Sequence, residues 1–280
     1  MLAAGLMLHS CLDLDPQDQL AETNIWSSPA DYKLFANQFY SWTRDFSSLD
    51  NNSTKPLHSD YNSDLFTCKD DRNRFSNGTN SVQESDGNYG SAYAHIRRTN
   101  LLLQNASNYA NQTDIAQYVG EAKFFRAYFY FELVRRYQNV PLITKVVTQA
   151  EANAAEPASA EQIFDFIISE CTELSTFLPV DYTKMPGNEY GRATRGAALA
   201  LKARAALYAA SPLFNSGNNK SKWVAAAEAA YEIIGQSSAL GYKLDASFSN
   251  LFGATNTASN EVILVRPTGT STSFEAANFP

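Results

Sequence analysis

Apolar side chains recur every three or four positions along most of the chain, which is the spacing of one face of an α-helix. The longest such stripe runs through residues 114–137, and a second runs through residues 160–178. Ser159 and Gln162 form the Ser-x-x-Gln pattern of a capping box at the start of the second stripe. The same spacing predicts three further helices, with apolar stripes over residues 31–42, 91–107 and 222–234. The first of these is expected to start at Ser28, with Pro29 in its first turn. The chain is therefore expected to be mainly α-helical.

The stretch GRATRGAALALKARAALYAASP, residues 191–212, differs from the other predicted helices because its side chains are small on almost every face. It contains eight alanines between Ala197 and Ala210, and Thr194 is its predicted N-cap. Small side chains allow other helices to approach closely from more than one side. We therefore expect this helix to lie between neighbouring helices in a stacked arrangement.

The predicted helices begin at irregular intervals, near residues 92, 114, 160, 194 and 221. We expect successive helices to form antiparallel hairpins. Only the step from 160 to 194 matches the tetratricopeptide period of about 34 residues. The predicted fold is therefore an irregular stack of tetratricopeptide-like helical hairpins with long loops. Residues 151–157 are expected to be an Ala/Glu linker, and residues 261–266 (EVILVR) a short strand near the C-terminal end.

Residues 45–88 show no sustained period and are rich in Ser, Asn, Asp and Gly. Such a long irregular stretch inside a compact domain is uncommon and is often functional. Its carboxylates, amides, arginines and aromatic rings suit the recognition of a polar ligand. A long solvated loop without a ligand is the alternative interpretation.

The first ten residues are apolar and are followed by Cys11, in the sequence LHSC. The segment is too short to span a membrane. It is similar to a bacterial lipobox, although His9 stands where a small residue is usual. We interpret residues 1–11 as a signal segment whose cleavage leaves Cys11 for lipidation, and residues 12–280 as one domain. A buried N-terminal strand with a free thiol is the alternative. The chain stops in a Ser/Thr/Gly-rich segment, so we expect a C-terminal portion to be missing.

The composition argues against several classes of function. A net charge of −7 is unfavourable for a nucleic-acid partner, which requires a basic face. The three cysteines and three histidines show no metal-ligand spacing, so we expect neither a metal nor another cofactor. The chain has no Gly-rich phosphate loop, nucleophile elbow or HExxH motif, and we expect it not to be an enzyme. A pair of glycosidase carboxylates stays open, because their separation is spatial.

Several motifs resemble those of the SusD/RagB lipoproteins. The pattern Tyr89-x3-Tyr93-x2-Ile96-x3-Asn100 is similar to a W-x3-Y helix of that family, with Tyr89 in place of the tryptophan. Residues 120–144, GEAKFFRAYFYFELVRRYQNVPLIT, resemble the family's most recognisable helix and the turn that follows it. Further similarity lies in the mature N-terminal start, the small-residue helix and the EVI segment, residues 11–16, 191–212 and 261–264.

This resemblance implies a nutrient-binding lipoprotein on the cell surface, held in the outer membrane by a lipid on Cys11. Such a protein delivers oligosaccharides to a TonB-dependent, SusC-like transporter. Ligand residues vary within the family, so the resemblance implies only the region of the site, near the start of the W-x3-Y helix. The candidate ligand residues there are Tyr61, Arg72, Asn88 and Tyr89. The alternatives are a peptide-binding uptake lipoprotein and a tetratricopeptide-type protein scaffold without a small ligand.

Overall fold

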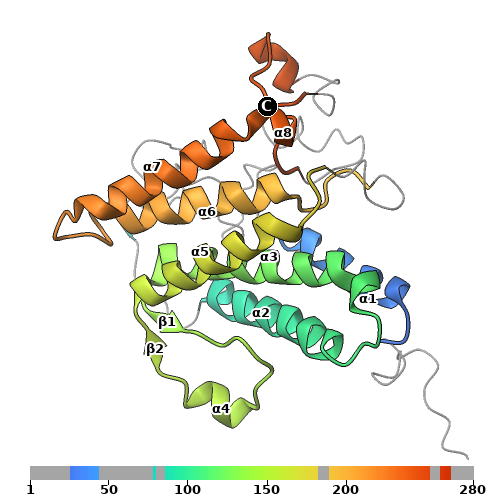
Figure 1. Ribbon diagram of the computed structural model, residues 1–280. Helices are drawn as coiled ribbons and strands as arrows, with labels where there is room; N and C mark the ends of the chain where they lie inside the picture. Colours follow the sequence, from blue (N-terminus) through green and yellow to red (C-terminus); the bar gives the residue numbers. More distant parts are fainter. Residues whose placement is uncertain (1–25, 44–77, 80–85, 182–188, 253–258, 266–280) are drawn as a thin grey trace, which may run out of the picture.

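The computed structural model describes residues 26–43, 78–79, 86–181, 189–252 and 259–265. Within these ranges the protein is mainly helical, as predicted (Figure 1). The α-helices are α1 (Pro29–Ser41), α2 (Gly87–Ala106), α3 (Gln112–Tyr137), α4 (Gln149–Asn153), α5 (Ala160–Phe177), α6 (Arg195–Ala210), α7 (Lys220–Gly235) and α8 (Ser237–Leu240). The remaining elements of the described residues are the short strands β1 (Val140–Pro141) and β2 (Pro157–Ala158) and a 3-10 helix at Phe248–Phe252.

Polar side chains mark the starts of α2, α5, α6 and α7, because they bond free backbone N–H groups of the first turn. Ser159 and Thr194 cap α5 and α6 as predicted, and accept from the backbone N–H groups of Gln162 and Ala197. These two starts are therefore encoded locally in the sequence.

Helices α2 and α7 are among those that begin earlier than the apolar spacing predicted. α2 starts at Gly87 because Asp86 accepts a hydrogen bond from the backbone N–H of Asn88 at 2.8 Å. α7 starts at Lys220 because Asn219 is its N-cap and accepts from the backbone N–H of Ser221 at 3.0 Å. In both cases the cap precedes the apolar stripe, so periodicity alone places the start too late.

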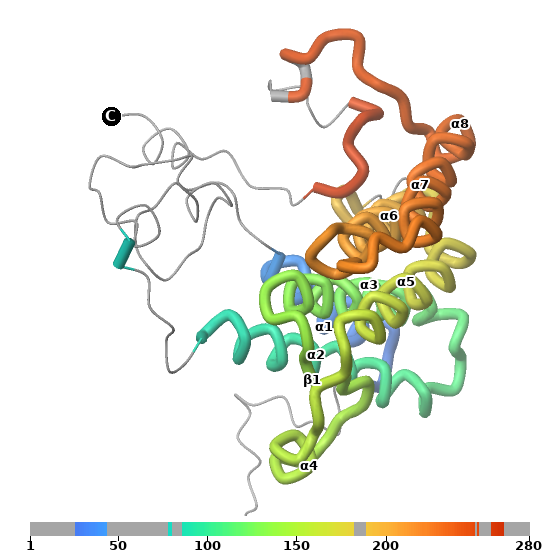
Figure 2. Tube along the Cα trace, turned by 90° about the vertical axis from the view of Figure 1, so that its left-hand side faces the viewer, coloured from blue at the N-terminus to red at the C-terminus, as the bar shows by residue number. Residues whose placement is uncertain are grey.

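The long helices form a stack in which the chain direction alternates from one helix to the next (Figure 1). α2 packs on α3, α3 on α5, α5 on α6 and α6 on α7, while α1 packs against α2 and α3. Figure 2 shows the same order from the side. This arrangement confirms the irregular tetratricopeptide-like hairpins predicted from the sequence.

The hydrophobic core lies around α3, which contacts α1, α2, α5 and α6. Phenylalanine rings from α3 fill this core, and each of them is at most 3% exposed: Phe124, Phe125, Phe129 and Phe131. Because α3 is covered on several sides, its polar residues are also drawn into the interior. Two of its charged side chains are consequently buried, and one of them supports the candidate site described below.

The small side chains of α6 allow helices to approach from both sides, as the sequence predicted. α5 lies on one side and α7 on the other (Figure 1). At the start of α6 a Cβ atom added at Gly196 would lie 1.9 Å from the hydroxyl oxygen of Tyr242, so the close approach of Tyr242, which follows α8, requires glycine there. On the α7 side the contact is formed by a separate cluster of alanines, Ala206, Ala210, Ala226 and Ala229.

Two predictions for the connecting segments are wrong. Residues 151–157 are not a linker, because a capping box between Thr148 and Glu151 starts α4 and the segment ends in β2. Residues 261–265 adopt turns and bends instead of a strand. The backbone N–H of Val262 donates within its own turn, and in the described residues no strand pairs with this segment.

Candidate functional site

A groove of about 750 Å³ separates α2 from the segment that follows α3. This segment, residues 141–153, runs from β1 to the end of α4. The antiparallel pairing of β1 with β2 holds together the two ends of the loop that contains α4. Both views place α4 beyond α2, at the edge of the helix stack (Figures 1 and 2). The α2 wall of this α2–α4 groove includes Tyr89, Tyr93, Arg97 and Asn100, and the opposite wall includes Ile143, Lys145, Gln149 and Asn153.

Tyr89 packs against two other tyrosines at the start of α2. Its ring centroid lies 5.0 Å from that of Tyr93 and 5.1 Å from that of Tyr137. The Tyr93 hydroxyl donates to the carbonyl of Pro141 at 2.7 Å, and the Tyr137 hydroxyl donates to the carboxylate of Asp86 at 2.6 Å. Burial raises the pKa of Tyr93, so its hydroxyl stays protonated at neutral pH. The half-buried Tyr89 ring is therefore fixed at one end of the groove.

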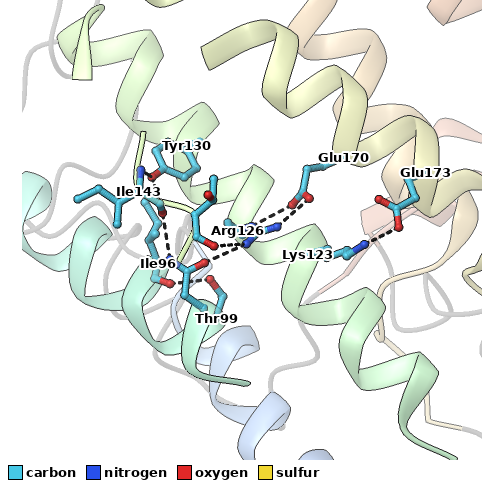
Figure 3. Close-up of polar contacts among 10 residues, drawn as sticks. Ile96, Thr99, Lys123, Arg126, Tyr130, Ile143, Glu170 and Glu173 are labelled. Atoms are coloured by element: carbon cyan, nitrogen blue, oxygen red, sulfur yellow. Dashed lines mark hydrogen bonds and ion pairs between the residues drawn. The ribbon is translucent and has the colours of Figure 1, made fainter. Parts of the chain in front are cut away.

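The opposite wall of the groove is held through its backbone. The Asn100 side-chain amide donates to the carbonyls of Ile143 at 3.0 Å and Lys145 at 3.2 Å. The Tyr130 hydroxyl donates to the Ile143 carbonyl at 2.9 Å and accepts from the Ile143 N–H at 2.6 Å (Figure 3). Residues 143–145 are therefore tied to both α2 and α3.

A buried ion pair completes this support. The Arg126 guanidinium on α3 donates to the two carboxylate oxygens of Glu170 on α5, at 2.8 and 3.0 Å (Figure 3). Its Nη1 atom also donates to the Asn100 side-chain oxygen and to the carbonyl of Thr144, each at 3.0 Å. The side chains of Arg126 and Glu170 are only 9% and 10% exposed. One guanidinium thus joins α2, α3, α5 and the groove wall.

A second buried ion pair lies outside the groove. Arg192 donates to the fully buried carboxylate of Glu121 at 2.7 Å, and links the residues before α6 to α3. Burial raises the pKa of Glu121, while the Arg192 charge opposes that rise. Neither residue lines the groove. We therefore assign this pair to the packing of the helix stack.

The structure brings one of the predicted ligand residues into the groove. Tyr89 lies in its wall, whereas Asn88 is exposed beside it and donates its side-chain amide to the N-cap of α2 at 3.0 Å. Tyr61 and Arg72, like Cys11, lie outside the described residues. The ligand roles of all four candidates stay predictions.

The polar residues of the groove were not predicted from the sequence. Arg97 follows Tyr93 by four positions, and this helical spacing, which places two side chains on one face, was a usable signal. Lys145, Gln149 and Asn153 come from residues 141–153, a connecting segment of mixed apolar and polar residues whose sequence does not indicate which helix it faces. Only the hydrogen bonds from α2 and α3 bring that segment across from Tyr89.

The part of the chain that the structure describes contains no group of three or more His, Cys, Asp and Glu side chains arranged to hold a metal ion. None of its helices combines the length and the apolar character needed to cross a lipid bilayer.

Stacked, antiparallel helical hairpins of this kind define a tetratricopeptide-like, helical-repeat class of protein. A SusD-like family model, described as "Starch-binding associating with outer membrane", matches residues 11–207. The chain therefore belongs to this SusD-like family.

Individual relatives agree with this assignment. The chain is 27% identical over 276 residues to SusD-like protein P2 of Formosa agariphila, which covers 90% of this chain and 49% of that protein. A SusD-like protein from Bacteroides fragilis superimposes with a TM-score of 0.64 at 23% identity, over 89% of this chain and 46% of the other. A laminarin-binding SusD-like protein superimposes with a TM-score of 0.67 at 26% identity, over 84% of this chain and 50% of the other. The chain thus spans about half the length of these relatives.

Proposed function

We propose that this chain is a cell-surface glycan-binding lipoprotein that passes oligosaccharides to a TonB-dependent, SusC-like transporter. The observation that carries the proposal is the α2–α4 groove, with Tyr89 fixed at one end, in a member of the SusD-like family. The name of one similar solved protein, a laminarin-binding SusD-like protein, supports a glycan as the ligand.

The groove has the chemistry that sugar binding needs. The half-buried ring of Tyr89 offers an apolar face on which a sugar ring can stack. Gln149 and Asn153 are exposed amides on the opposite wall, joined to each other by a hydrogen bond of 2.8 Å. Amides both donate and accept, which matches the hydroxyl groups of a sugar. A groove of about 750 Å³ is also within the usual range for a small-ligand site.

We propose binding without catalysis. Glycoside hydrolysis generally requires two carboxyl groups that flank the scissile bond. Among the described residues, the lining of the groove includes neither Asp nor Glu. The described lining therefore supplies neither the acid nor the nucleophile or base of a glycosidase.

Attachment to the outer membrane and transfer to a transporter are parts of the same proposal. The family description names an association with the outer membrane. The lipobox-like sequence before Cys11 supplies a point for a lipid anchor. Together they support a protein held at the cell surface, where it meets oligosaccharides before the transporter does.

A protein-binding scaffold without a small ligand is the second candidate. It is favoured by the outer face of α7, which carries large apolar side chains that are between 40% and 69% exposed, Trp223, Val224, Tyr231 and Ile234. An apolar helix face of this kind suits a protein partner. This candidate predicts that the α7 face, and not the groove, determines binding.

Titration calorimetry of the 280-residue chain against panels of oligosaccharides and peptides tests the proposal. We expect at least one oligosaccharide to bind, and Tyr89→Ala to weaken that binding by about ten-fold, since stacking on an aromatic ring contributes about 1.4 kcal/mol. Tyr231→Ala is the matched control, because it removes an exposed tyrosine from α7. It should leave the affinity unchanged.

Tyr89 also packs on Tyr93 and Tyr137, so the melting temperature of each variant is measured alongside binding. The double variant Gln149→Ala/Asn153→Ala changes only exposed groove residues and should weaken binding without lowering the melting temperature. Binding of peptides alone would replace the glycan with a peptide ligand. Capture of a transporter without any small ligand, and its loss on Tyr231→Ala, would favour the scaffold.

A further inference from the structure

The charged residues that line the α2–α4 groove are both cationic. Arg97 on α2 and Lys145 on the opposite wall are exposed, and the described lining contains no carboxylate. The whole chain, by contrast, carries a net charge of −7. A positive groove on an acidic protein is a local feature, and clefts lined by one sign of charge concentrate ligands of the opposite sign.

Arg97 keeps most of its hydrogen-bonding capacity for a ligand. Its Nη1 atom donates to the carbonyl of Val147 at 2.7 Å, which extends the guanidinium from α2 toward the opposite wall. Its other N–H groups have no partner among the described residues. A guanidinium presents such groups as a planar fork that matches the oxygens of a carboxylate or a sulfate.

Lys145 is held through its backbone and not through its ammonium group. Its carbonyl accepts from Asn100 at 3.2 Å, and its exposed side chain forms no ion pair with a described residue. The Lys145 charge acts on the carboxylate of Glu151. That carboxylate accepts hydrogen bonds from the backbone N–H and the hydroxyl of Thr148 at 2.7 and 2.9 Å. These bonds and the Lys145 charge hold the pKa of Glu151 below its usual value. Glu151 is thus committed to capping α4, and the ammonium group stays available to a ligand.

The aromatic and the cationic residues of the groove lie at different positions along α2. Tyr89 and Arg97 are eight positions apart, which corresponds to about 12 Å along the helix axis. A sugar ring on Tyr89 and an anionic group at Arg97 therefore belong to different units of one chain. A single small acid would not reach both.

We propose that the α2–α4 groove binds an acidic oligosaccharide, one whose sugar units carry carboxylate or sulfate groups. One unit stacks on Tyr89, and an anionic group on a later unit lies between Arg97 and Lys145. The inference rests on the proposed function, because it names the ligand class of the same site. Carboxylate and sulfate share this recognition chemistry, and the experiment separates them.

Titration calorimetry with two matched pairs of oligosaccharides tests the inference. One pair is an oligogalacturonate and its methyl ester, and the other is a sulfated galactan oligosaccharide and its desulfated form. We expect the acidic member of at least one pair to bind about ten-fold more tightly at low salt, with the difference shrinking at high salt. A preference confined to one pair identifies which anion the groove accepts.

Charge-removing variants then locate the preference. Arg97→Gln and Lys145→Gln should each weaken binding of the acidic member by about three- to ten-fold and leave the neutral member unaffected. Arg97→Lys keeps the charge and should retain part of the affinity. Lys220→Gln, at the exposed start of α7, removes the same charge away from the groove and should change nothing.

Equal affinity for both members of each pair, with Tyr89→Ala still weakening binding, would overturn this inference and leave the proposed function standing. An acidic preference that survives in the Arg97→Gln/Lys145→Gln double variant would also overturn it, because the charge would be recognised elsewhere. Binding of no oligosaccharide at all would overturn the proposed function, and this inference with it.

Discussion

Replacing Arg126 by methionine tests whether one buried guanidinium supports both the helix stack and the groove wall. The substitution keeps a long apolar side chain but removes the positive charge between α2, α3 and α5. It leaves the Glu170 carboxylate, only 10% exposed, without its partner. It also removes the donor to the Asn100 side-chain oxygen and to the Thr144 carbonyl.

The expected loss of stability is about 3–5 kcal/mol, the usual consequence of leaving one charge of a buried pair unpaired. Thr144 is exposed, so water can replace its lost bond, and most of the loss is expected to come from Glu170. The double variant Arg126→Met/Glu170→Leu removes both charges. It should recover at least half of the loss, because apolar residues of similar size often replace a buried pair at little net cost.

Lys123→Met is the matched control, since Lys123 and Glu173 form an ion pair between the same two helices (Figure 3). Glu173 is 56% exposed, so breaking this pair should change stability by less than about 1 kcal/mol. Urea unfolding followed by circular dichroism, with tryptophan fluorescence as a check on two-state behaviour, measures all three variants. Hydrogen exchange of residues 143–147 should also accelerate in both variants that lack Arg126, and not in Lys123→Met.

Two results would refute this reasoning. If Arg126→Met destabilises the protein no more than Lys123→Met, the buried Arg126–Glu170 pair contributes no more to stability than the exposed Lys123–Glu173 pair. If the double variant is as unstable as Arg126→Met, the unpaired Glu170 charge is not the cause, and the lost bonds to Asn100 and Thr144 are.

The remaining predictions concern one pH effect and one close contact. Burial acts to raise the pKa of Asp86, but hydrogen bonds, above all that from Tyr137, bring it below its usual value. The stability contributed by the ionised Asp86 carboxylate is therefore present above the unfolded-state pKa of Asp86. It is lost as the pH falls through the lower, folded-state pKa of Asp86. Asp86→Ala should destabilise the protein by about 1 kcal/mol at neutral pH. Urea midpoints of the unmodified protein and the variant should converge below a pH of about 4. A difference in stability that does not change with pH would contradict the argument. Gly196→Ala should cost about 1–3 kcal/mol, because its Cβ would overlap the ring of Tyr242. Gly90→Ala has nothing within 4 Å and should instead gain about 0.5–1 kcal/mol; similar melting temperatures for the two would contradict the packing.

The helical stack was largely predictable because its signals are local. The apolar stripe of α3 and the capping residues Ser159 and Thr194 are each read within a few turns of sequence. The small side chains of α6 predicted close neighbours on both sides, which α5 and α7 provide. Of the two errors, residues 261–265 depend on a partner strand, whereas residues 151–157 followed a local signal, the Thr148-x-x-Glu151 capping box, that the prediction left out.

The candidate site was predictable only in part. Tyr89 was selected through its place in a recognisable motif, and the structure puts it in the groove wall. Arg97 carried a helical spacing to Tyr93 that the sequence analysis did not use. Lys145 carried no such signal, because a polar residue in a short connecting segment has the same pattern whether it faces a groove or solvent.

By itself the sequence determined where the long helices lie, which helix is closely packed on both sides, and that an aromatic residue lies in the first turn of α2. The tertiary structure alone decided which polar groups meet. Arg126 and Glu170 are 44 positions apart, and Asn100 and Ile143 are 43 apart. A periodic pattern assigns a charged residue to a helix face but does not say which distant group lies opposite. The groove exists because those distant contacts fix residues 143–145 across from α2, and that is a property of the folded stack and not of either segment.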